Sequence, residues 1–346
     1  MSPLRSGKIR VLIADDSPTL RRALSALLAE DPRLEVAGEA EDGFEAVRLC
    51  KLLRPDVVTM DAEMPGLDGL GATRAIMADH PARVLMVCAV AEDRQLDLSF
   101  AAIAAGALEL IAKPHASSRG APQDLRRFGR AVADAILLMA EVPVVRRPQP
   151  HPSKRSPPGR AARAVGAVGI VASTGGPPAL AAILGALPAK LRCSILIAQH
   201  IADGFTAGLR RWLAAVSPLP VAVALDGARC VPGTVWLPPD GCDLIVEPGL
   251  RLRTPPAAGL YRPSGNLLLS SLAAALGPRA AGLVLTGMGD DGAQGLLALR
   301  RAGGHCFAQD QETSVVFGMP QAARDLGAAE QLLPLDEIAA RIVELA

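Results

Sequence analysis

The sequence predicts two α/β domains joined by a linker. We expect a five-stranded parallel sheet in the first domain and a doubly wound, mainly parallel sheet in the second. Three observations support this prediction. The chain has 346 residues, more than one ordinary core requires; short apolar stretches alternate with helical ones in both halves; and a proline-rich stretch separates the halves. The expected boundaries are 1–141 for the first domain, 142–164 for the linker and 165–346 for the second domain.

In the first domain, five apolar stretches predict strands, each followed by a stretch with helical periodicity. The strands are expected in RVLIAD, EVAGEA, DVVTMD, RVLMVCA and LELIAK. The helices are expected at 18–29, 43–53, 69–78, 97–105 and 124–141. This alternation is typical of a parallel sheet with helices on both faces.

The stretch VVRRPQPHPSKRSPPGRAAR interrupts the pattern, with five prolines, six Lys or Arg residues and no acidic residue. Such a composition buries too little apolar surface to fold. We interpret it as a solvated spacer rather than a phosphate-binding segment.

The alternation then resumes, with strands expected in VGAVGIVAS, CSILIAQH, PVAVALD, AGLVLTGM and HCFAQD. Helices are expected after residue 177, at 204–216, at 267–276 and after residue 292. Short strands and turns are expected between the third of these strands and the next helix.

Composition limits the function classes. The formal net charge is +1, which provides no general attraction for nucleic acid. The six cysteines form no Cys-x-x-Cys pair, and no stretch approaches a signal peptide or a membrane span. We therefore expect a cytoplasmic protein with reduced thiols, no nucleic-acid partner and no membrane insertion.

Charged side chains follow three of the first domain's strands. Asp15 and Asp16 follow the first, Asp61 follows the third, and Lys113 follows the fifth. Because the carboxyl ends of parallel strands share one edge of a sheet, these side chains should converge there. Three carboxylates repel one another, and their oxygens suit Mg²⁺. The sequence therefore predicts a magnesium site.

This arrangement, carried by IADDS, TMDAEMPGLDG and IAKP, resembles the receiver domains of two-component response regulators, which have a flavodoxin-like fold. The resemblance implies that Asp61 is the phosphorylated residue. It also implies that Asp16 binds Mg²⁺ directly, that Asp15 binds it through water, and that Lys113 contacts the phosphoryl group.

Two positions depart from the receiver pattern. Cys88 stands where receivers have Ser or Thr, and Leu110 stands where they have an aromatic residue. A thiol is a weaker hydrogen-bond donor than a hydroxyl. Leucine cannot provide the family's aromatic rotamer switch. We therefore expect a weakened response to phosphorylation.

In the second domain, Ser173 follows an apolar stretch and precedes TGGPPAL. It could cap a helix, help to bind a phosphate or act as a nucleophile. A phosphate loop requires further glycines or a lysine, which TGGPPAL lacks. Taken alone, the residues favour helix capping.

Two later strands change this interpretation. His200 ends one strand, and Asp290 and Asp291 follow another. In a parallel sheet these strand ends could bring Ser173, His200 and one aspartate together. A serine hydroxyl needs a base to take its proton, and the imidazole needs a carboxylate to orient it. The pattern favours a nucleophilic serine.

These stretches, together with YRPSGN and AQDQETSVVFGMP, resemble the chemotaxis response-regulator methylesterases, which are protein-glutamate methylesterases. The order of domains is also the same. The resemblance implies that Ser173 is the nucleophile, His200 the base and Asp291 the orienting acid. It also implies that Thr174 lies beside the nucleophile and that the Met288 amide lines the oxyanion pocket.

The same resemblance implies a reaction and its partners. Methyl-accepting chemoreceptors would be the substrates and a chemotaxis histidine kinase the phosphodonor, with Mg²⁺ in the receiver and no cofactor in the catalytic domain. Glutamine deamidation could follow the same steps. The alternatives are a partner-binding or DNA-binding output domain and a nicotinamide-dependent oxidoreductase. The first needs a helix-turn-helix or basic output domain, and the second needs a glycine fingerprint that the sequence lacks.

Three positions depart from the methylesterase pattern. Val171 replaces a usual glycine, Asp243 stands where histidine is common, and Asn266 replaces an aspartate. None is expected to touch the triad, so we expect any effect to fall on the rim of the substrate site.

Overall fold

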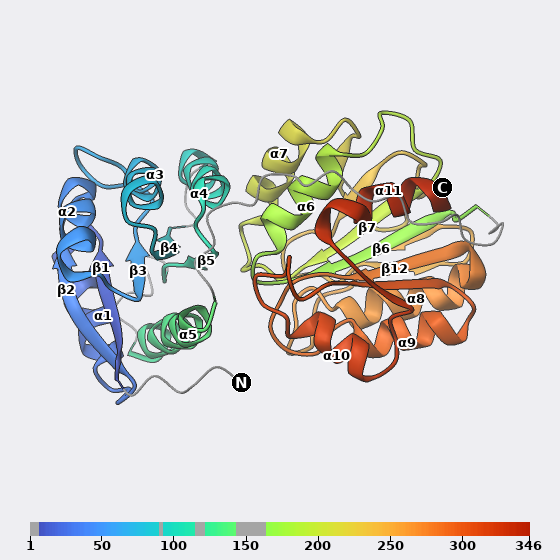
Figure 1. The fold of residues 1–346 in the computed structure, drawn as a ribbon. Coiled ribbons are helices and arrows are strands. Elements are labelled where there is room, and N and C mark those ends of the chain that lie inside the picture. The colour runs from blue at the N-terminus through green and yellow to red at the C-terminus, as the bar shows by residue number, and fades with distance from the viewer. Residues whose placement is uncertain (1–6, 90–92, 115–121, 143–163) are drawn as a thin grey trace. The chain divides into compact units, whose positions relative to one another are not determined.

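The computed structural model describes residues 7–89, 93–114, 122–142 and 164–346 (Figure 1). Contacts divide the chain into two compact units between Arg147 and Pro148.

The first unit is a five-stranded sheet with the strand order β2-β1-β3-β4-β5. Every neighbouring pair is parallel. The strands are β1 (Ile9–Ala14), β2 (Leu34–Ala40), β3 (Val57–Met60), β4 (Arg83–Cys88) and β5 (Glu109–Ala112). The helices are α1 (Pro18–Leu28), α2 (Gly43–Leu53), α3 (Gly69–Asp79), α4 (Asp93–Ala105) and α5 (Pro122–Ala140). Helices α2, α3 and α4 cover one face of the sheet, and α1 and α5 cover the other (Figure 1).

Local sequence explains where these helices start. The side chains of Ser17, Asp42 and Asp68 accept hydrogen bonds from backbone amides in the first turns of α1, α2 and α3, which satisfies donors that have no partner within the helix. Helix α4 begins four residues before the predicted start. Leu96 and Phe100 are both buried, so the earlier turn contributes to the apolar face.

The second unit contains a seven-stranded sheet with the order β14-β13-β12-β6-β7-β9-β8 and a separate antiparallel pair, β10-β11. All neighbours in the large sheet are parallel. The strands are β6 (Ala167–Ala172), β7 (Ser194–Gln199), β8 (Val221–Val223), β9 (Val235–Leu237), β10 (Ile245–Glu247), β11 (Arg251–Arg253), β12 (Ala280–Val284), β13 (His305–Gln309) and β14 (Gln331–Leu333).

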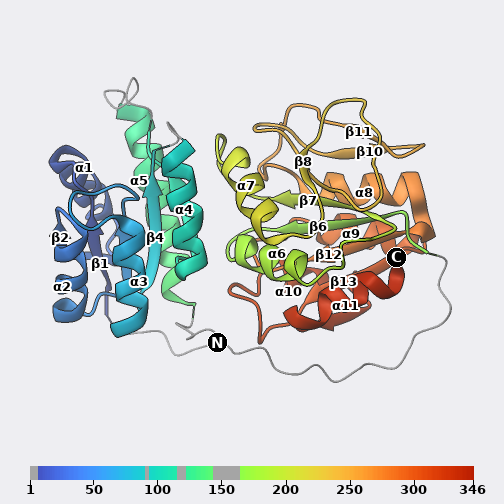
Figure 2. The same ribbon diagram turned by 90° about the horizontal axis from the view of Figure 1, so that it is seen from above.

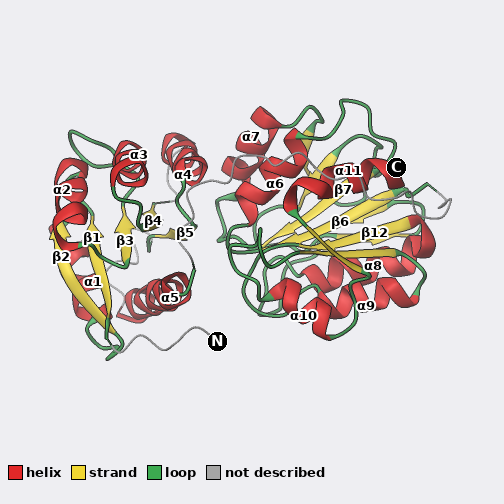
Figure 3. Ribbon diagram, viewed as in Figure 1, coloured by secondary structure: helices red, strands yellow, loops and turns green. Residues whose placement is uncertain are grey.

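The helices of the second unit are α6 (Gly176–Gly185), α7 (Thr206–Val216), α8 (Gly265–Leu276), α9 (Ala293–Arg301), α10 (Met319–Asp325) and α11 (Leu335–Leu345), with a short 3₁₀ turn at Gly277–Arg279. Helices α6, α7 and α11 cover one face of the large sheet, and α8, α9 and α10 cover the other (Figures 2 and 3). The central strands β6, β7 and β12 are buried throughout, as expected for strands covered on both faces.

The sequence prediction omitted β14, α10 and α11. Helix α11 has a regular apolar face, since Ile338, Ile342 and Leu345 are buried. Its periodicity was therefore available in the sequence. Among the described residues, no helix combines the length and the apolar character needed to span a bilayer.

Candidate functional site

The carboxyl edge of the first sheet brings together the predicted charged residues. The carboxylates of Asp15, Asp16 and Asp61 have oxygens within 4.8 Å of one another. The ammonium of Lys113 lies 2.6 Å from Asp15 Oδ2 and 2.6 Å from Asp61 Oδ2. Asp16 is exposed, whereas the other two carboxylates are buried. Three carboxylates against one lysine form an oxygen-rich, negatively charged donor set that fits Mg²⁺.

The charges of these side chains also support a magnesium site at the carboxyl edge of the first sheet. Burial raises the pKa of Asp61 to about 6, with Lys113 opposing the shift and Asp15 adding to it. The pKa of Lys113 is raised, because the charges of Asp61 and Asp15 outweigh the effect of burial. The lysine is therefore charged at neutral pH and balances part of the carboxylate charge.

The two departures from the receiver pattern are both buried. Cys88 ends β4, and its Sγ lies 4.0 Å from the carbonyl oxygen of Ile111. Burial raises the pKa of this thiol to about 12, so it is protonated at neutral pH. Leu110 lies within β5 and is 7% exposed.

Ser173 lies in the short connection between β6 and α6. Gly175 caps α6 with φ of 76°, a left-handed conformation that favours glycine. The α6 cap has no side-chain hydrogen bond, so the helix-capping alternative for Ser173 is wrong. The Ser173 carbonyl accepts hydrogen bonds from the Gly176 amide at 2.8 Å and from Gln199 Nε2 at 2.9 Å. The backbone of the serine is therefore fixed from two sides.

His200 follows the neighbouring strand at the same level as Ser173. Ala172 and Gln199 are register partners in β6 and β7, and the His200 amide donates to the Ala172 carbonyl at 2.9 Å. Ser173 and His200 thus follow paired residues on strands about 4.8 Å apart. Within the described residues, no hydrogen bond joins the Ser173 hydroxyl to His200. Catalytic hydrogen bonds often tighten only with substrate bound.

Asp291 lies against the imidazole. Its Oδ2 is 2.8 Å from His200 Nε2, and the residue has no exposed surface. The Gly265 amide donates to Oδ2 at 2.6 Å, and the Asn266 amide donates to Oδ1 at 2.9 Å. Burial alone would raise the pKa of Asp291, but the hydrogen bonds from His200 and the two amides outweigh it, so the pKa is lowered. The carboxylate stays ionised and accepts all three hydrogen bonds.

The loop after β12 approaches Ser173 closely. A Cβ at Gly287 would lie 2.6 Å from Ser173 Cβ, so Met288 follows a residue that packs against the serine. Met288 itself is 56% exposed. Thr174 is buried, and its carbonyl accepts a hydrogen bond from Thr286 Oγ1 at 2.9 Å. Thr286 therefore ties the connection after β6 to the end of β12.

The positions that depart from the methylesterase pattern surround the Asp291 contacts. Asp243 is buried and accepts a 2.6 Å hydrogen bond from the Ser264 amide, just before α8. Asn266 Oδ1 accepts from the Gly295 amide at 2.8 Å. Val171 occupies the space beside Gly265, where a Cβ would lie 2.1 Å from Val171 Cγ1. The expectation that none of these positions touches the triad is wrong for Asn266, whose backbone amide donates to Asp291. An effect on the rim of the substrate site stays a prediction.

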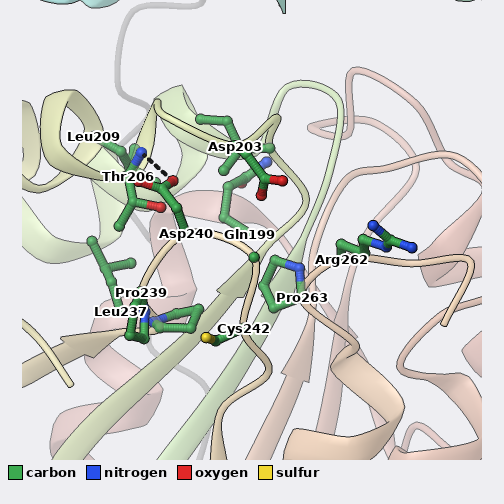
Figure 4. Close-up of a pocket in the computed structure, with 13 residues that line it drawn as sticks. Gln199, Asp203, Thr206, Leu209, Leu237, Pro239, Asp240, Cys242, Arg262 and Pro263 are labelled. Atoms are coloured by element: carbon green, nitrogen blue, oxygen red, sulfur yellow. Dashed lines mark hydrogen bonds between the residues drawn. The ribbon is translucent and has the colours of Figure 1, made fainter. Parts of the chain in front are cut away.

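A pocket is lined by residues at and after the ends of β7 and β9 (Figure 4). Gln199 and Ile201, on either side of His200 in the chain, both line it. Its acidic residues are Asp203 and Asp240, and Asp240 accepts a 3.3 Å hydrogen bond from the Thr206 amide. The other lining residues are Leu209, Leu237, Pro238, Pro239, Gly241, Cys242, Arg262 and Pro263.

Sequence reasoning assigned no role to several residues that contact this site. Gln199 and Thr286 fix the Ser173 connection, and Tyr261 stacks on His200, with ring centroids 5.2 Å apart and an interplanar angle of 11°. Tyr261 lies in the YRPSGN stretch that carried the resemblance. The motif therefore pointed to this segment without indicating what the tyrosine contacts.

The two units together define a response regulator whose output unit is an α/β enzyme domain. Residues 168–342 match the model of the CheB methylesterase family, and residues 11–121 match that of the response regulator receiver domain. The chain belongs to the CheB methylesterase family. The predictions of a receiver domain, of the fold class and of a methylesterase are confirmed, and the DNA-binding and oxidoreductase alternatives are set aside.

The chain is similar to curated proteins over almost its whole length. The protein-glutamate methylesterase/protein-glutamine glutaminase 3 of Myxococcus xanthus (strain DK1622) is 56% identical over 94% of this chain and 91% of that protein. The protein of the same name from Anaeromyxobacter dehalogenans (strain 2CP-C) is 44% identical over 96% of this chain and 98% of that protein. The crystal structure of the Thermotoga maritima CheB methylesterase catalytic domain is 32% identical, with a TM-score of 0.51, over 53% of this chain and 100% of that chain.

Proposed function

We propose that this protein hydrolyses methyl esters of glutamate side chains in chemoreceptors, using Ser173, His200 and Asp291, under the control of phosphorylation at Asp61. The observation that carries the proposal is the 2.8 Å contact between His200 Nε2 and the buried Asp291 carboxylate, at the level of the strand end that holds Ser173. The two similar proteins are named for the methylesterase and glutaminase activities.

Acylation begins when Ser173 Oγ attacks the ester carbonyl carbon. Because Nε2 of His200 is hydrogen-bonded to Asp291, Nδ1 is the nitrogen that accepts the serine proton. The imidazolium then gives this proton to the methoxide oxygen, and methanol leaves as the acyl-serine forms. Asp291 stabilises the imidazolium because its carboxylate is ionised and buried against the ring.

The negative charge on the former carbonyl oxygen needs hydrogen-bond donors. We assign the backbone amide of Met288 to this role, because the preceding residue, Gly287, packs directly on Ser173. Each such donor contributes about 3–4 kcal/mol to lowering the barrier. Water then attacks the acyl carbon as His200 takes its proton. The bond from this carbon to Ser173 Oγ breaks, His200 returns the proton to Oγ, and glutamate is released. A glutamine substrate would follow the same steps with ammonia as the leaving group.

In the receiver, Asp61 would take the phosphoryl group from a chemotaxis histidine kinase. Asp15, Asp16 and Asp61 would hold Mg²⁺, which neutralises phosphoryl charge when bound. Lys113, 2.6 Å from Asp61, would remain within reach of the phosphoryl oxygens. Burial of Asp61 beside this lysine keeps the reacting carboxylate in a defined position.

The proposed reaction is tested by methanol release from methylated chemoreceptors, with and without a small phosphodonor. Ser173→Ala should abolish turnover, with a loss of several orders of magnitude. The substitution removes one oxygen from a half-buried residue, so folding should be retained and can be checked by circular dichroism. Methanol release by Ser173→Ala at the wild-type rate would exclude this serine as the nucleophile.

A further inference from the structure

Tyr261 contacts the candidate active site in two ways. Its ring stacks on His200 at a centroid distance of 5.2 Å and an interplanar angle of 11°. Its hydroxyl donates a 2.9 Å hydrogen bond to Asp290 Oδ1, in the residue that precedes Asp291. The chain contains a single tyrosine, and this is its position.

The backbone of residues 288–290 packs so closely against Tyr261 that no further atom fits between them. Gly289 has φ of 90°, and a Cβ there would lie 2.5 Å from the Tyr261 hydroxyl oxygen. The phenol therefore rests on the backbone between Met288 and Asp290. One side chain thus contacts both the proposed base and the loop that carries the proposed oxyanion donor.

We propose that Tyr261 is a positioning residue that fixes the ring plane of His200 and couples it to the 288–290 loop through Asp290. This inference rests on the proposed triad.

The physical basis is the freedom that the triad contacts leave to the imidazole. The bond from Nε2 to Asp291 fixes one ring atom, but the ring can still tilt about that contact. Stacking against an aromatic face restricts this tilt and excludes water from one face of the imidazole. Nδ1 is then held toward Ser173, and small errors in such alignment reduce the rate strongly.

The first test compares Tyr261→Leu, which removes the ring, with Tyr261→Phe, which keeps the stack and removes the hydroxyl. Leu260→Ala is the matched control, since Leu260 is adjacent in the same segment and 90% exposed. With methylated chemoreceptors as substrate, kcat of Tyr261→Leu should fall on the order of 10- to 100-fold, with KM within about twofold. Tyr261→Phe should show only a small part of this fall in kcat. Leu260→Ala should have the kcat of the wild type.

A second measurement needs no turnover. Diethyl pyrocarbonate modifies accessible imidazoles, and its rate at His200 can be followed by mass spectrometry of the peptide. Tyr261→Leu should increase this rate because one ring face becomes open, whereas Tyr261→Phe should not. An unchanged rate in Tyr261→Leu would mean that the stack does not cover the imidazole, and the inference would fail.

The coupling to Asp290 is tested by a double-mutant cycle. Tyr261→Phe removes the donor and Asp290→Ala removes the acceptor of the same hydrogen bond, so the double variant should lose no more activity than the worse single variant. Losses that multiply would show independent roles and overturn the coupling. This cycle remains informative if Tyr261→Leu fails to fold.

These results separate the inference from the proposed function. If Ser173→Ala remained active, the triad would be wrong, although the modification rates at His200 would still report on the stack. If Ser173→Ala is inactive while Tyr261→Leu keeps wild-type kcat, the triad stands and Tyr261 is not a positioning residue.

Discussion

Asp291 Oδ2 lies 2.8 Å from His200 Nε2, and the same carboxylate accepts two backbone amides at the start of α8. A helix N-terminus favours negative charge, so α8 holds Asp291 in the ionised form that an imidazolium requires. The residue before it, Asp290, is exposed and bonds to Tyr261. Adjacent aspartates therefore have different environments and different expected roles.

The first prediction compares these two aspartates. Asp291→Asn should reduce kcat on the order of 10⁴-fold, as expected when the residue that orients a catalytic histidine is lost. Asp290→Asn should cost only a few-fold, because the side chain it contacts acts indirectly. Steady-state methanol release measures both, and a larger loss in Asp290→Asn would reverse the assignment.

The second prediction concerns stability and pH. The pKa of Asp291 is lowered, so its contribution to folding is present above the unfolded pKa of about 3.9 and disappears as pH falls through the folded value. Asp291→Asn should therefore destabilise the second unit by about 1–3 kcal/mol at neutral pH, with a smaller difference in acid.

Tryptophan fluorescence during denaturant unfolding isolates this unit, because both tryptophans of the chain, Trp212 and Trp236, lie within it. A difference between wild type and Asp291→Asn that grew as pH fell would contradict the assigned direction of the shift.

The third prediction concerns Val171 and Gly265. A Cβ at residue 265 would lie 2.1 Å from Val171 Cγ1, so Gly265→Ala should displace the amide that donates to Asp291. We expect a loss of about 1–3 kcal/mol in stability together with a reduced kcat. Val171→Ala in the same chain should restore part of both losses by removing the clashing methyl groups. Additive losses in the double variant would show that the two sites do not share this space.

The fourth prediction concerns the pocket that Gln199 and Ile201 line. Five of the six cysteines are buried, whereas Cys242, which lines this pocket, is half-buried. Burial and the nearby carboxylates of Asp243 and Asp203 raise the pKa of the Cys242 thiol, so a thiol-specific alkylating reagent should react slowly at neutral pH and faster in alkali. If the pocket receives substrate, alkylation should raise KM severalfold. The KM of Cys242→Ser should be insensitive to the reagent. An equal rise in KM in this control would show that alkylation acts at another residue.

The sequence was sufficient to predict the residues at the strand ends but not the contacts that hold them. Parallel sheets place strand carboxyl ends at one edge, so Asp61 and Lys113 could be grouped from the order of elements alone. Gly265 and Asp291 are joined by the packing of α8 beside the loop after β12, and Tyr261 reaches His200 through an irregular segment. Such contacts depend on tertiary packing of loops, for which local periodicity carries no signal.

The last prediction concerns the strength of the phosphorylation switch. A phosphoryl group on Asp61 would need a donor at the end of β4, and Cys88 provides a protonated but weakly donating thiol. The nearby hydroxyl of Ser99 already donates to the Gln95 carbonyl at 2.7 Å. Leu110 is buried and has no aromatic ring to reorient. Phosphorylation should therefore shift the receiver only partly toward its active state.

If the unphosphorylated receiver restrains the esterase, deleting residues 1–145 should raise activity more than a phosphodonor does. Cys88→Thr should narrow this difference by supplying a stronger donor. Cys50→Ser is the matched control, because Cys50 is a buried cysteine of α2 in the same unit and should leave the difference unchanged. Methanol release from methylated receptors measures all four proteins. If the phosphodonor activates the natural sequence as fully as the deletion, phosphorylation already drives the complete shift and the weak-switch hypothesis is wrong.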